Sequence, residues 1–342
     1  MAVSIASISG SAAHGGTLII SGSGFGTKPG VTPVVWDNCS GTRITDLWSG
    51  GWPSRGTVNY QLQYRDAPYR GIAAPHNRVG RYMTGAHGDS NGYDAGYNVM
   101  VFRSRTISFP AYSYASWYQR CDDNWVFTGD SNFKCYDYSR GTEPYDLPNN
   151  WYTEYNPRPT SRTATPSWHA NDDNGSFSGG YPWGQNAVNP MSGVWTKVEH
   201  YVEISNLTGF IKVYENGQLK LNMTTRTDAM SGNIRCDAIG GFSRSYGQPN
   251  NWRYFADLYL DYTLQHVSFG NASTIDACTV LEVQPTTAWS PTSITATVNR
   301  GTFSDGQNVY LYVFDEAGTA NASGLLVGMG TPPAAPTNLQ VR

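Results

Sequence analysis

Two pairs of acidic residues lie four positions apart in segments whose alternating pattern predicts strands: Glu199 with Glu203, and Asp257 with Asp261. A sugar hydrolase uses two such carboxyl groups, one on each side of the glycosidic bond. Positions i and i+4 of a strand share a face but lie about 13 Å apart, at roughly 3.3 Å per residue. Hydrolysis needs about 5.5 Å, or about 6.5–9.5 Å, between the carboxyls. Neither pair is spaced for hydrolysis by itself, and both are typical of a solvated or ligand-facing strand.

Histidine and tyrosine are the residues with which a polysaccharide lyase would remove a proton. His87 and Tyr93 lie near Arg78 and Arg81 in the sequence, and a lyase could recruit such a set, although no spacing rule selects it. His200 alternates with apolar residues in a predicted strand. That pattern predicts a buried core histidine rather than a catalytic base.

A surface that combines aromatic rings with charged groups suits a sugar, because rings stack on its apolar face and polar groups bond its hydroxyls. Alternation places such residues on one side of the segments 194–204 and 251–263, opposite the side of His200. Tryptophan-rich loops offer further rings. The candidate carbohydrate-binding residues are Trp195, Lys197, Glu199, Tyr201, Arg253, Asp257 and Tyr259 on the strands, and Trp151, Trp168 and Trp183 in the loops.

Two segments concentrate hard oxygen ligands around a glycine turn, as a calcium site requires. Neither completes a twelve-residue EF-hand loop, because no Glu stands at its final position. Calcium is therefore the one cofactor for which the sequence offers candidates, and ordinary Asx-rich turns are the alternative. The candidate ligands are Asp89, Asn91, Asp94, Asp172 and Asn174.

The composition limits the partners. The net charge is −3 and no run of Lys or Arg occurs, which excludes the basic patch of a nucleic-acid-binding protein. The sequence contains no run of about 20 apolar residues, which is the length needed to span a membrane. The start, MAVSIASISGSAAHGG, lacks the basic region and apolar core of a signal peptide. We expect a protein of the extracellular space or of a virion surface, expressed without its leader or released by lysis.

The five cysteines are an odd number, so at least one is free or pairs between chains. None has the C-x-x-C spacing of a zinc or thioredoxin-type centre. We expect one or two structural disulfides. Cys121 and Cys135 could flank a loop, but the sequence does not fix the pairing.

Many short, aromatic-rich segments separated by turns predict an all-β protein. The 342 residues include 37 Gly, 19 Pro and 23 Tyr, and only 14% are charged. Asn216-Gly217 between two alternating runs predicts a β-hairpin. Residues 139–190 lack clear periodicity and are expected to be long loops. Strands are predicted at residues 97–109, 111–119, 194–204, 210–223 and 251–263.

The first residues run VSIASISG and TLIISGSGFG, which resembles the opening half of an IPT/TIG domain, an immunoglobulin-like β-sandwich. Residues 280–328, with SITATV and NVYLYVFD, resemble its closing strands. The resemblance implies one small sandwich made by residues 1–36 and 280–330, hydrogen-bonded to each other, with a proline-rich tail at 331–342. The opening motif is carried by Ile5, Ile8, Gly10, Gly16, Ile20, Gly22, Phe25 and Gly26.

Three segments of the inserted region, residues 37–279, resemble late strands of the concanavalin A-like lectin/glucanase jelly roll. They read W-x-K-V-E from Trp195, G-x-I-K-V-Y-x-N-G from Gly209 and F-A-D-L-Y-L-D from Phe255. Laminin G domains and several polysaccharide lyases and glycosidases share that fold. The resemblance implies a jelly-roll β-sandwich, while the glucanase signature E-x-D-x-x-E is absent.

These observations favour a non-catalytic carbohydrate-binding or adhesive surface protein whose partner is a polysaccharide or surface glycan. They are compatible with a virion decoration or fibre component, and with assembly as a homo-oligomer. One alternative is a polysaccharide lyase or glycoside hydrolase of the jelly-roll class. Another is a purely structural assembly module. We expect no turnover of glycans, because the sequence contains no recognisable catalytic constellation.

Overall fold

Segments with β-branched and aromatic residues at alternate positions form antiparallel strands, as their propensity predicts. The structure is a computed structural model that describes residues 2–48, 62–87, 100–106, 111–123, 125, 132–141, 150–156, 167–172, 183–186, 191–228, 232–240, 243–244 and 251–328. Its helices, in the part of the chain so described, are short 3-10 turns such as η1 (Ile44–Asp46) and η4 (Ile275–Ala277). The prediction of an all-β protein is confirmed.

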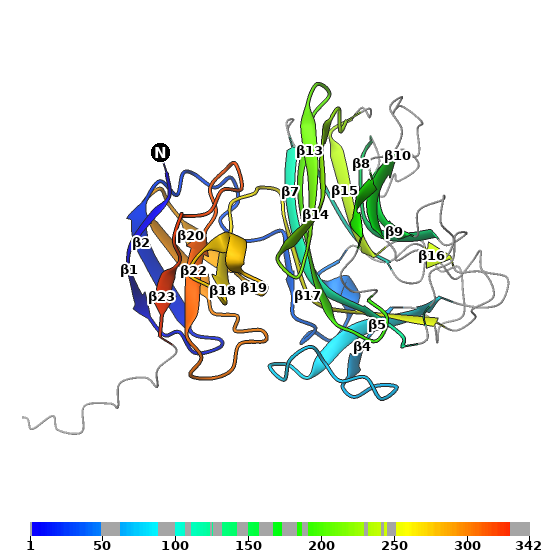
Figure 1. Ribbon diagram of the computed structural model, residues 1–342, viewed down its shortest axis with the longest axis horizontal. Coiled ribbons are helices and arrows are strands. Elements are labelled where there is room, and N and C mark those ends of the chain that lie inside the picture. Colours follow the sequence, from blue (N-terminus) through cyan, green and yellow to red (C-terminus); the bar gives the residue numbers. More distant parts are fainter. Residues whose placement is uncertain are drawn as a thin grey trace, which may run out of the picture. The chain divides into compact units, whose positions relative to one another are not determined.

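Figure 1 labels many of the strands and colours them in chain order. The strands are β1 (Ser4–Gly10), β2 (Thr17–Ser23), β3 (Val35–Asp37), β4 (Gln63–Asp66), β5 (Arg81–His87), β6 (Met100–Thr106), β7 (Ala111–Cys121), β8 (Asn132–Gly141), β9 (Asn150–Asn156), β10 (Ser167–Asp172), β11 (Trp183–Asn186), β12 (Thr196–Ile204), β13 (Gly209–Glu215), β14 (Gln218–Thr225), β15 (Ile234–Gly240), β16 (Ser243–Arg244), β17 (Asn251–Asp261), β18 (Val267–Gly270), β19 (Leu281–Gln284), β20 (Thr286–Trp289), β21 (Ser293–Thr297), β22 (Val309–Val313) and β23 (Leu325–Val327).

The chain divides into two compact units. The terminal unit comprises Met1–Pro33 and Leu264–Arg342, and the central unit comprises Val34–Thr263. Each has its own hydrophobic core, so each is described by itself. No helix among the described residues is long and apolar enough to cross a membrane.

The terminal unit contains two four-stranded sheets, ordered β1-β2-β21-β20 and β19-β18-β22-β23. Strand β2 pairs with β21, with Leu18 opposite Ala296, so strands from both ends of the chain share a sheet. Apolar side chains of the two sheets form one core, which includes Ile20, Phe269 and Leu311. The second segment begins at Leu264 rather than at residue 280, because β18 pairs with both β19 and β22.

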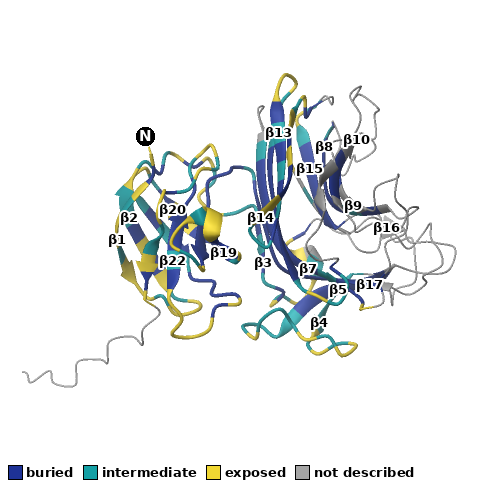
Figure 2. Cartoon of the chain, in the orientation of Figure 1, coloured by how far each residue is buried: buried dark blue, intermediate teal, exposed yellow. Residues whose placement is uncertain are grey.

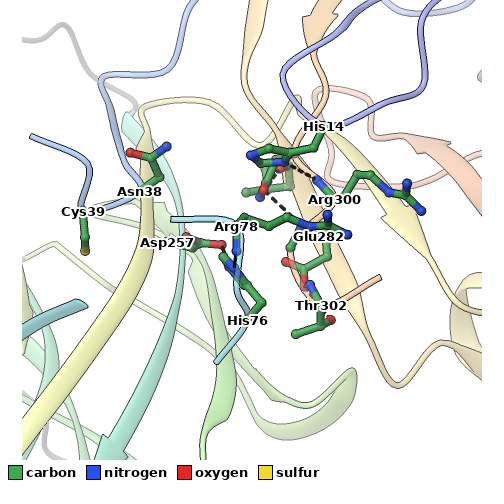
Figure 3. A network of polar contacts seen from close by, with 12 residues as sticks. His14, Asn38, Cys39, His76, Arg78, Asp257, Glu282, Arg300 and Thr302 are labelled. Carbon is green, nitrogen blue, oxygen red and sulfur yellow. Dashed lines mark hydrogen bonds and ion pairs between the residues drawn. The ribbon is translucent and has the colours of Figure 1, made fainter. Parts of the chain in front are cut away.

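A buried carboxylate holds one turn of the terminal unit. Glu282 accepts hydrogen bonds from the N–H and the hydroxyl of Thr302, each 2.8 Å long (Figure 3). The preceding residue, Gly301, has φ +47°, and an added Cβ would lie 2.1 Å from the Glu282 carboxyl carbon. Only glycine fits this turn, because the carboxylate occupies the space of a side chain.

The central unit is a sandwich of two antiparallel sheets (Figure 1). One sheet runs β14-β13-β12-β7-β17-β5-β4, with β3 added on β17, and we call it the eight-stranded sheet. The other, the seven-stranded sheet, runs β11-β10-β9-β8-β15-β6, with β16 added on β8. The core between them includes Val198, Val202, Leu258 and Leu260, as their alternation predicted. Figure 2 shows these strands largely buried.

Most predicted strands of the central unit are present. Asn216 and Gly217, with φ +49° and +73°, form the turn of the β13–β14 hairpin, so that prediction is confirmed. The prediction of long loops over residues 139–190 is wrong, because β9, β10, β11 and the end of β8 lie there. The sequence there is rich in Asn, Pro and Gly, which hid the alternation.

The expectation of disulfides is wrong. All five cysteines are buried and none of them forms a disulfide: Cys39, Cys121, Cys135, Cys236 and Cys278. Cys121 belongs to β7 and Cys135 to β8, which are strands of different sheets, and each packs in the apolar core. Burial raises the pKa of Cys121 to about 12, so the thiol behaves as a small apolar side chain.

Candidate functional site

The predicted sugar-binding face of β12 lies on the side of the eight-stranded sheet opposite the core, but it is buried rather than half exposed. Lys197, Glu199 and Tyr201 are all in the buried class. The Lys197 ammonium lies 4.4 Å from the ring centroid of Tyr118, and Glu199 accepts a 2.7 Å hydrogen bond from the Tyr114 hydroxyl. These groups have protein partners, so in this structure they offer no open platform for a sugar.

Strand β17 contains a β-bulge that the sequence pattern did not reveal. Its pairing with β7 shifts register between Ala256 and Tyr259, and Asp257 has φ +50°. The extra residue reverses the alternation, so Arg253 lies on the opposite face from Tyr259. Arg253 is buried against the ring of Phe133, 4.0 Å from its centroid. The prediction that Arg253 shares a face with Asp257 and Tyr259 is therefore wrong, and Tyr259 itself is buried.

The three loop tryptophans belong to strands. Trp168, on β10, is fully buried and meets the ring of His200 edge-on at 5.4 Å, so it serves the core. Trp151 lies in β9 opposite Asp172 of β10, Trp183 begins β11, and the side chains of both tryptophans lie outside the described residues. A sugar-binding role for these two stays a prediction.

The candidate calcium ligands fall outside the described part of the chain, with one exception. Asp89, Asn91, Asp94 and Asn174 are not among the described residues, and Asp172 is described only as the last residue of β10. A calcium site in these segments stays a prediction.

Aromatic rings gather at one end of the eight-stranded sheet, on the face opposite the core. Tyr82 of β5 and Tyr254 of β17 meet edge-on at 5.5 Å, and Trp195 lies 5.8 Å from Tyr82. Tyr69, in the turn after β4, meets the ring of Trp252 edge-on at 5.7 Å. Tyr82 and Tyr254 are buried, whereas Tyr69 and Trp195 are part-exposed, so the cluster reaches the surface.

Two arginines lie over these rings. The Arg65 guanidinium is 4.9 Å from the Tyr69 centroid, and the Arg70 guanidinium is 5.0 Å from that of Trp252. We call Arg65, Tyr69, Arg70, Trp195 and Trp252 the arginine–aromatic surface. Aromatic rings with cationic hydrogen-bond donors stacked on them are suited to bind a polar ligand that also has an apolar face.

Hydrogen bonds from the sheet fix the turn that carries this surface. The Tyr82 hydroxyl accepts a 2.9 Å hydrogen bond from the Tyr69 N–H and lies 2.9 Å from the Ile72 carbonyl oxygen. Arg70 has φ +53°, an uncommon conformation for a residue with a side chain. The Trp195 indole N–H donates to the Ala73 carbonyl at 2.9 Å. The rings are thus fixed before any ligand arrives.

Asp122 forms hydrogen bonds with two residues of the aromatic cluster. Its carboxylate accepts hydrogen bonds from the Tyr254 hydroxyl at 2.6 Å and from the Trp252 N–H at 2.9 Å. Burial and this carboxylate raise the pKa of Tyr254 well above its ordinary value, so the hydroxyl stays protonated. The Arg70 guanidinium lies 3.7 Å from Asp122 as an ion pair.

Sequence reasoning identified Trp195 but missed the rest of this surface. The available signal was the repeated Tyr-Arg pair, Tyr64-Arg65 and Tyr69-Arg70, on either side of Ala67-Pro68. It was missed because the four residues belong to a strand and a turn, and only the fold brings Trp252 and Trp195 to them.

A buried histidine ties the loop after this turn to the sheet. His76 Nε2 lies 2.7 Å from the Asp257 carboxylate, and its Nδ1 accepts a hydrogen bond from the Arg78 N–H at 3.3 Å (Figure 3). Since Nδ1 accepts, Nε2 carries the proton and donates to Asp257. Both ring nitrogens are engaged, which suits a structural anchor rather than a base.

Of the predicted lyase set, the structure describes the side chains of Arg78 and Arg81, so the set stays a prediction. Arg81 donates to the carbonyl oxygens of Cys39 and Gly41 and pairs with Asp66 at 2.8 Å, which makes it a structural residue. The side chain of His87 and all of Tyr93 lie outside the described residues.

Another histidine lies on the face of the seven-stranded sheet opposite the core. His169 follows the core residue Trp168 in β10, and Glu154 of β9 pairs with His169 on one side and with Lys134 of β8 on the other. Burial lowers the pKa of His169 to about 4. The imidazole is therefore neutral at neutral pH, and the same burial makes it a weak base.

Comparison with known proteins finds no matching protein family and no curated protein with a matching sequence. Solved structures do resemble the chain. The alginate lyase Aly36B is 11% identical, with a TM-score of 0.35 over 56% of this chain and 86% of the lyase. An endo-β-1,4-glucuronan lyase from the fungus Trichoderma reesei is 10% identical, with a TM-score of 0.37 over 63% and 92%. The Emp47p carbohydrate recognition domain is 12% identical, with a TM-score of 0.34 over 61% and 91%. Similarities of this strength do not identify an activity.

Proposed function

We propose that the central unit is a carbohydrate-binding jelly roll and that the arginine–aromatic surface is its binding site. The observation that carries the proposal is the part-exposed rings of Tyr69 and Trp195, with the Arg65 guanidinium over the Tyr69 ring. A pyranose presents an apolar face to a ring and its hydroxyls to hydrogen-bond donors at the ring edge.

The rigidity of the surface supports binding. Tyr82 holds the turn at Tyr69, and Ala73 holds the indole of Trp195. A site that is already ordered loses little conformational entropy on binding. Few contacts are then enough for a weak, reversible association. The surface itself contains no carboxylate pair that could cleave a glycosidic bond.

Binding is tested with the intact chain on a glycan array, followed by calorimetry with the polymers retained. Trp195→Ala and Tyr69→Ala should each weaken binding by about 2- to 10-fold, because one aromatic contact contributes about 0.5–1.5 kcal/mol. Leu207→Ala is the matched control, since Leu207 is the most exposed of the large apolar residues described, at 82%. Binding that survives both ring variants would move the site elsewhere. A complete absence of binding would favour a structural assembly module.

A polysaccharide lyase is the second candidate, and His169 favours it. The side chain is neutral, lies on a sheet face, and is aligned through Glu154 with Lys134. A neutral imidazole with a lysine on the second strand away could take part in removing a proton adjacent to a uronic acid carboxylate. Ultraviolet absorbance from an unsaturated product, abolished in a folded His169→Asn variant, would support this candidate. No product from any uronic-acid polymer would remove it.

The proposed glycan binding also bears on where the protein acts and on how it assembles. A glycan-binding protein acts where glycans are exposed, in the extracellular space or on a virion surface. We also propose that the terminal unit is an IPT/TIG-like sandwich, because both chain ends contribute strands to one sheet. Sedimentation of the intact chain tests whether it forms a homo-oligomer.

A further inference from the structure

We propose that the ligand of the arginine–aromatic surface is an acidic polysaccharide, whose carboxylate groups are bound by Arg65 and Arg70. The inference rests on the proposed function, because it names the chemical class of the glycan bound at the same surface. It rests on the arrangement of the two guanidinium groups, the hydrogen bonds that Arg65 does not make, and the charges around them.

Cations and rings alternate across the surface. Arg65 lies over Tyr69, Tyr69 meets Trp252 edge-on, and Arg70 lies over Trp252. A guanidinium stacked on a ring is fixed in plane while its N–H edge stays available. Two such groups on neighbouring rings form a row of donors along one surface rather than a single cationic point.

Arg65 has donors to spare. In the part of the chain that the structure describes, its guanidinium makes no ion pair and no hydrogen bond, and its Nε is buried without a hydrogen-bond partner. The guanidinium of Arg65 instead stacks on the ring of Tyr69. A guanidinium carries five N–H donors in a planar fork that matches the two oxygens of a carboxylate. A buried donor without a partner costs free energy, which a ligand carboxylate would recover.

Arg70 is held in place at some conformational cost. Its backbone has φ +53°, a conformation that residues with a side chain rarely adopt, and this directs the guanidinium onto Trp252. The side chain remains 42% exposed. Uncommon backbone conformations persist where the surrounding structure enforces them, and they concentrate at ligand sites. Here Tyr82 enforces it by bonding the same turn.

The acidic residues nearby are already engaged. Asp122 accepts from the Tyr254 hydroxyl and the Trp252 N–H, and Asp123 pairs with Arg120. Counting three arginines (Arg65, Arg70 and Arg120) against these two carboxylates leaves one positive charge in excess. The surface is therefore locally cationic on a chain whose net charge is −3.

A neutral sugar would stack on Trp195 and Tyr69 but would leave the charge of Arg65 without a counterpart, whereas Arg70 is paired with Asp122. A uronic acid unit supplies both an apolar ring face and a carboxylate. Because the arginines are part-exposed, the attraction is screened by salt. Binding of an acidic polymer should therefore weaken as the ionic strength rises, whereas binding of a neutral polymer should not.

The experiment compares each acidic polymer with its own carboxyl-reduced product, using polygalacturonate, polyglucuronate and alginate, on the intact chain. We expect at least tenfold tighter binding of the acidic form, because a hydrogen bond to a charged group contributes about 1.5–3 kcal/mol. The preference should largely disappear at about 0.5 M salt. Arg65→Met with Arg70→Met should abolish the preference while leaving the reduced polymers bound, since Met retains the apolar stem.

Arg43→Met is the matched control, because Arg43 is 75% exposed in a surface pair with Asp46. Arg65→Lys separates charge from geometry and should retain only part of the preference, since Lys lacks the fork. Circular dichroism establishes that each variant is folded. Equal binding of acidic and reduced polymers overturns this inference and leaves the proposed function standing. If no polymer of either form binds, the proposed function itself fails.

Discussion

His200 and Trp117 stack in the core of the central unit, with ring centroids 5.0 Å apart and planes inclined by 9°. His200 lies on β12 and Trp117 on the neighbouring strand β7. The Thr153 hydroxyl, from the facing sheet, lies 2.8 Å from His200 Nε2. The histidine thus joins the two sheets of the sandwich, and the prediction of a core histidine is confirmed.

His200 makes stability depend on pH. Burial lowers the pKa of His200 to about 3, below its ordinary value of 6.5. Its contribution is fully present above pH 6.5, and it is lost as the pH falls toward 3, because the unfolded state binds a proton that the folded state does not. His200→Phe should reduce the acid dependence of the central unit's free energy of unfolding by about 1.4 kcal/mol per pH unit. Urea denaturation between pH 7 and pH 4, followed by tryptophan fluorescence, measures this slope.

The control for this slope is His14→Gln, since His14 is exposed and belongs to the terminal unit. It should leave the slope of the central unit unchanged. An unaltered slope in His200→Phe would mean that the imidazole is not the group that titrates.

The sequence predicted what local pattern controls. Alternation located β12, β13 and β14, and Asn216-Gly217 located their hairpin, because these depend on residues close in sequence. It could not locate the bulge at Asp257, because nothing in the pattern marks an aspartate that adopts positive φ. One inserted residue moved Arg253 to the other face of the sheet and removed it from the predicted binding face.

The candidate site was harder to predict than the fold. Tyr69 and Trp252 meet through a turn and a strand more than 180 positions apart, so no spacing rule connects them. The burial of Glu199 could not be foreseen either, because a strand with one polar face predicts exposure on average. Burial is a property of the assembled chain.

A buried ion pair should contribute far more than an exposed one. Arg235 donates two hydrogen bonds of 2.7 Å to Asp237, and both side chains are fully buried. Asp237→Ala should lower the free energy of unfolding by about 3–5 kcal/mol, because it leaves the guanidinium uncompensated in the core. Asp46→Ala breaks the exposed pair with Arg43 and should cost about 0–1 kcal/mol. Urea denaturation compares the two. Similar losses from both variants would contradict the burial of Arg235.

The turn at Gly217 should tolerate no side chain. Its φ of +73° and that of Asn216 form the tight link between β13 and β14, and the Asn216 side chain accepts a 2.9 Å hydrogen bond from the Lys197 N–H. Gly217→Ala should lower the free energy of unfolding by about 1–2 kcal/mol, the cost of placing a Cβ in the left-handed region. Gly328→Ala, where an added Cβ meets no atom within 4 Å, should change it little. A neutral Gly217→Ala would show that the turn can relax.

The central unit should fold by itself. Its first strand pairs with its last, with Val35 opposite Leu260, so the chain enters and leaves the sandwich on neighbouring strands of one sheet. Its core is complete within Val34–Thr263, and the arginine–aromatic surface lies wholly inside that range. We expect this fragment to unfold cooperatively and to bind the same glycans as the intact chain.

The terminal unit should do the same when Pro33 is joined to Leu264 by a short Gly-Ser linker, because β2 and β21 already share a sheet. Thermal denaturation followed by circular dichroism measures both fragments. A fragment that lacks a cooperative transition would show that its core depends on the other unit. Such a result would contradict the insertion of one independent sandwich into another.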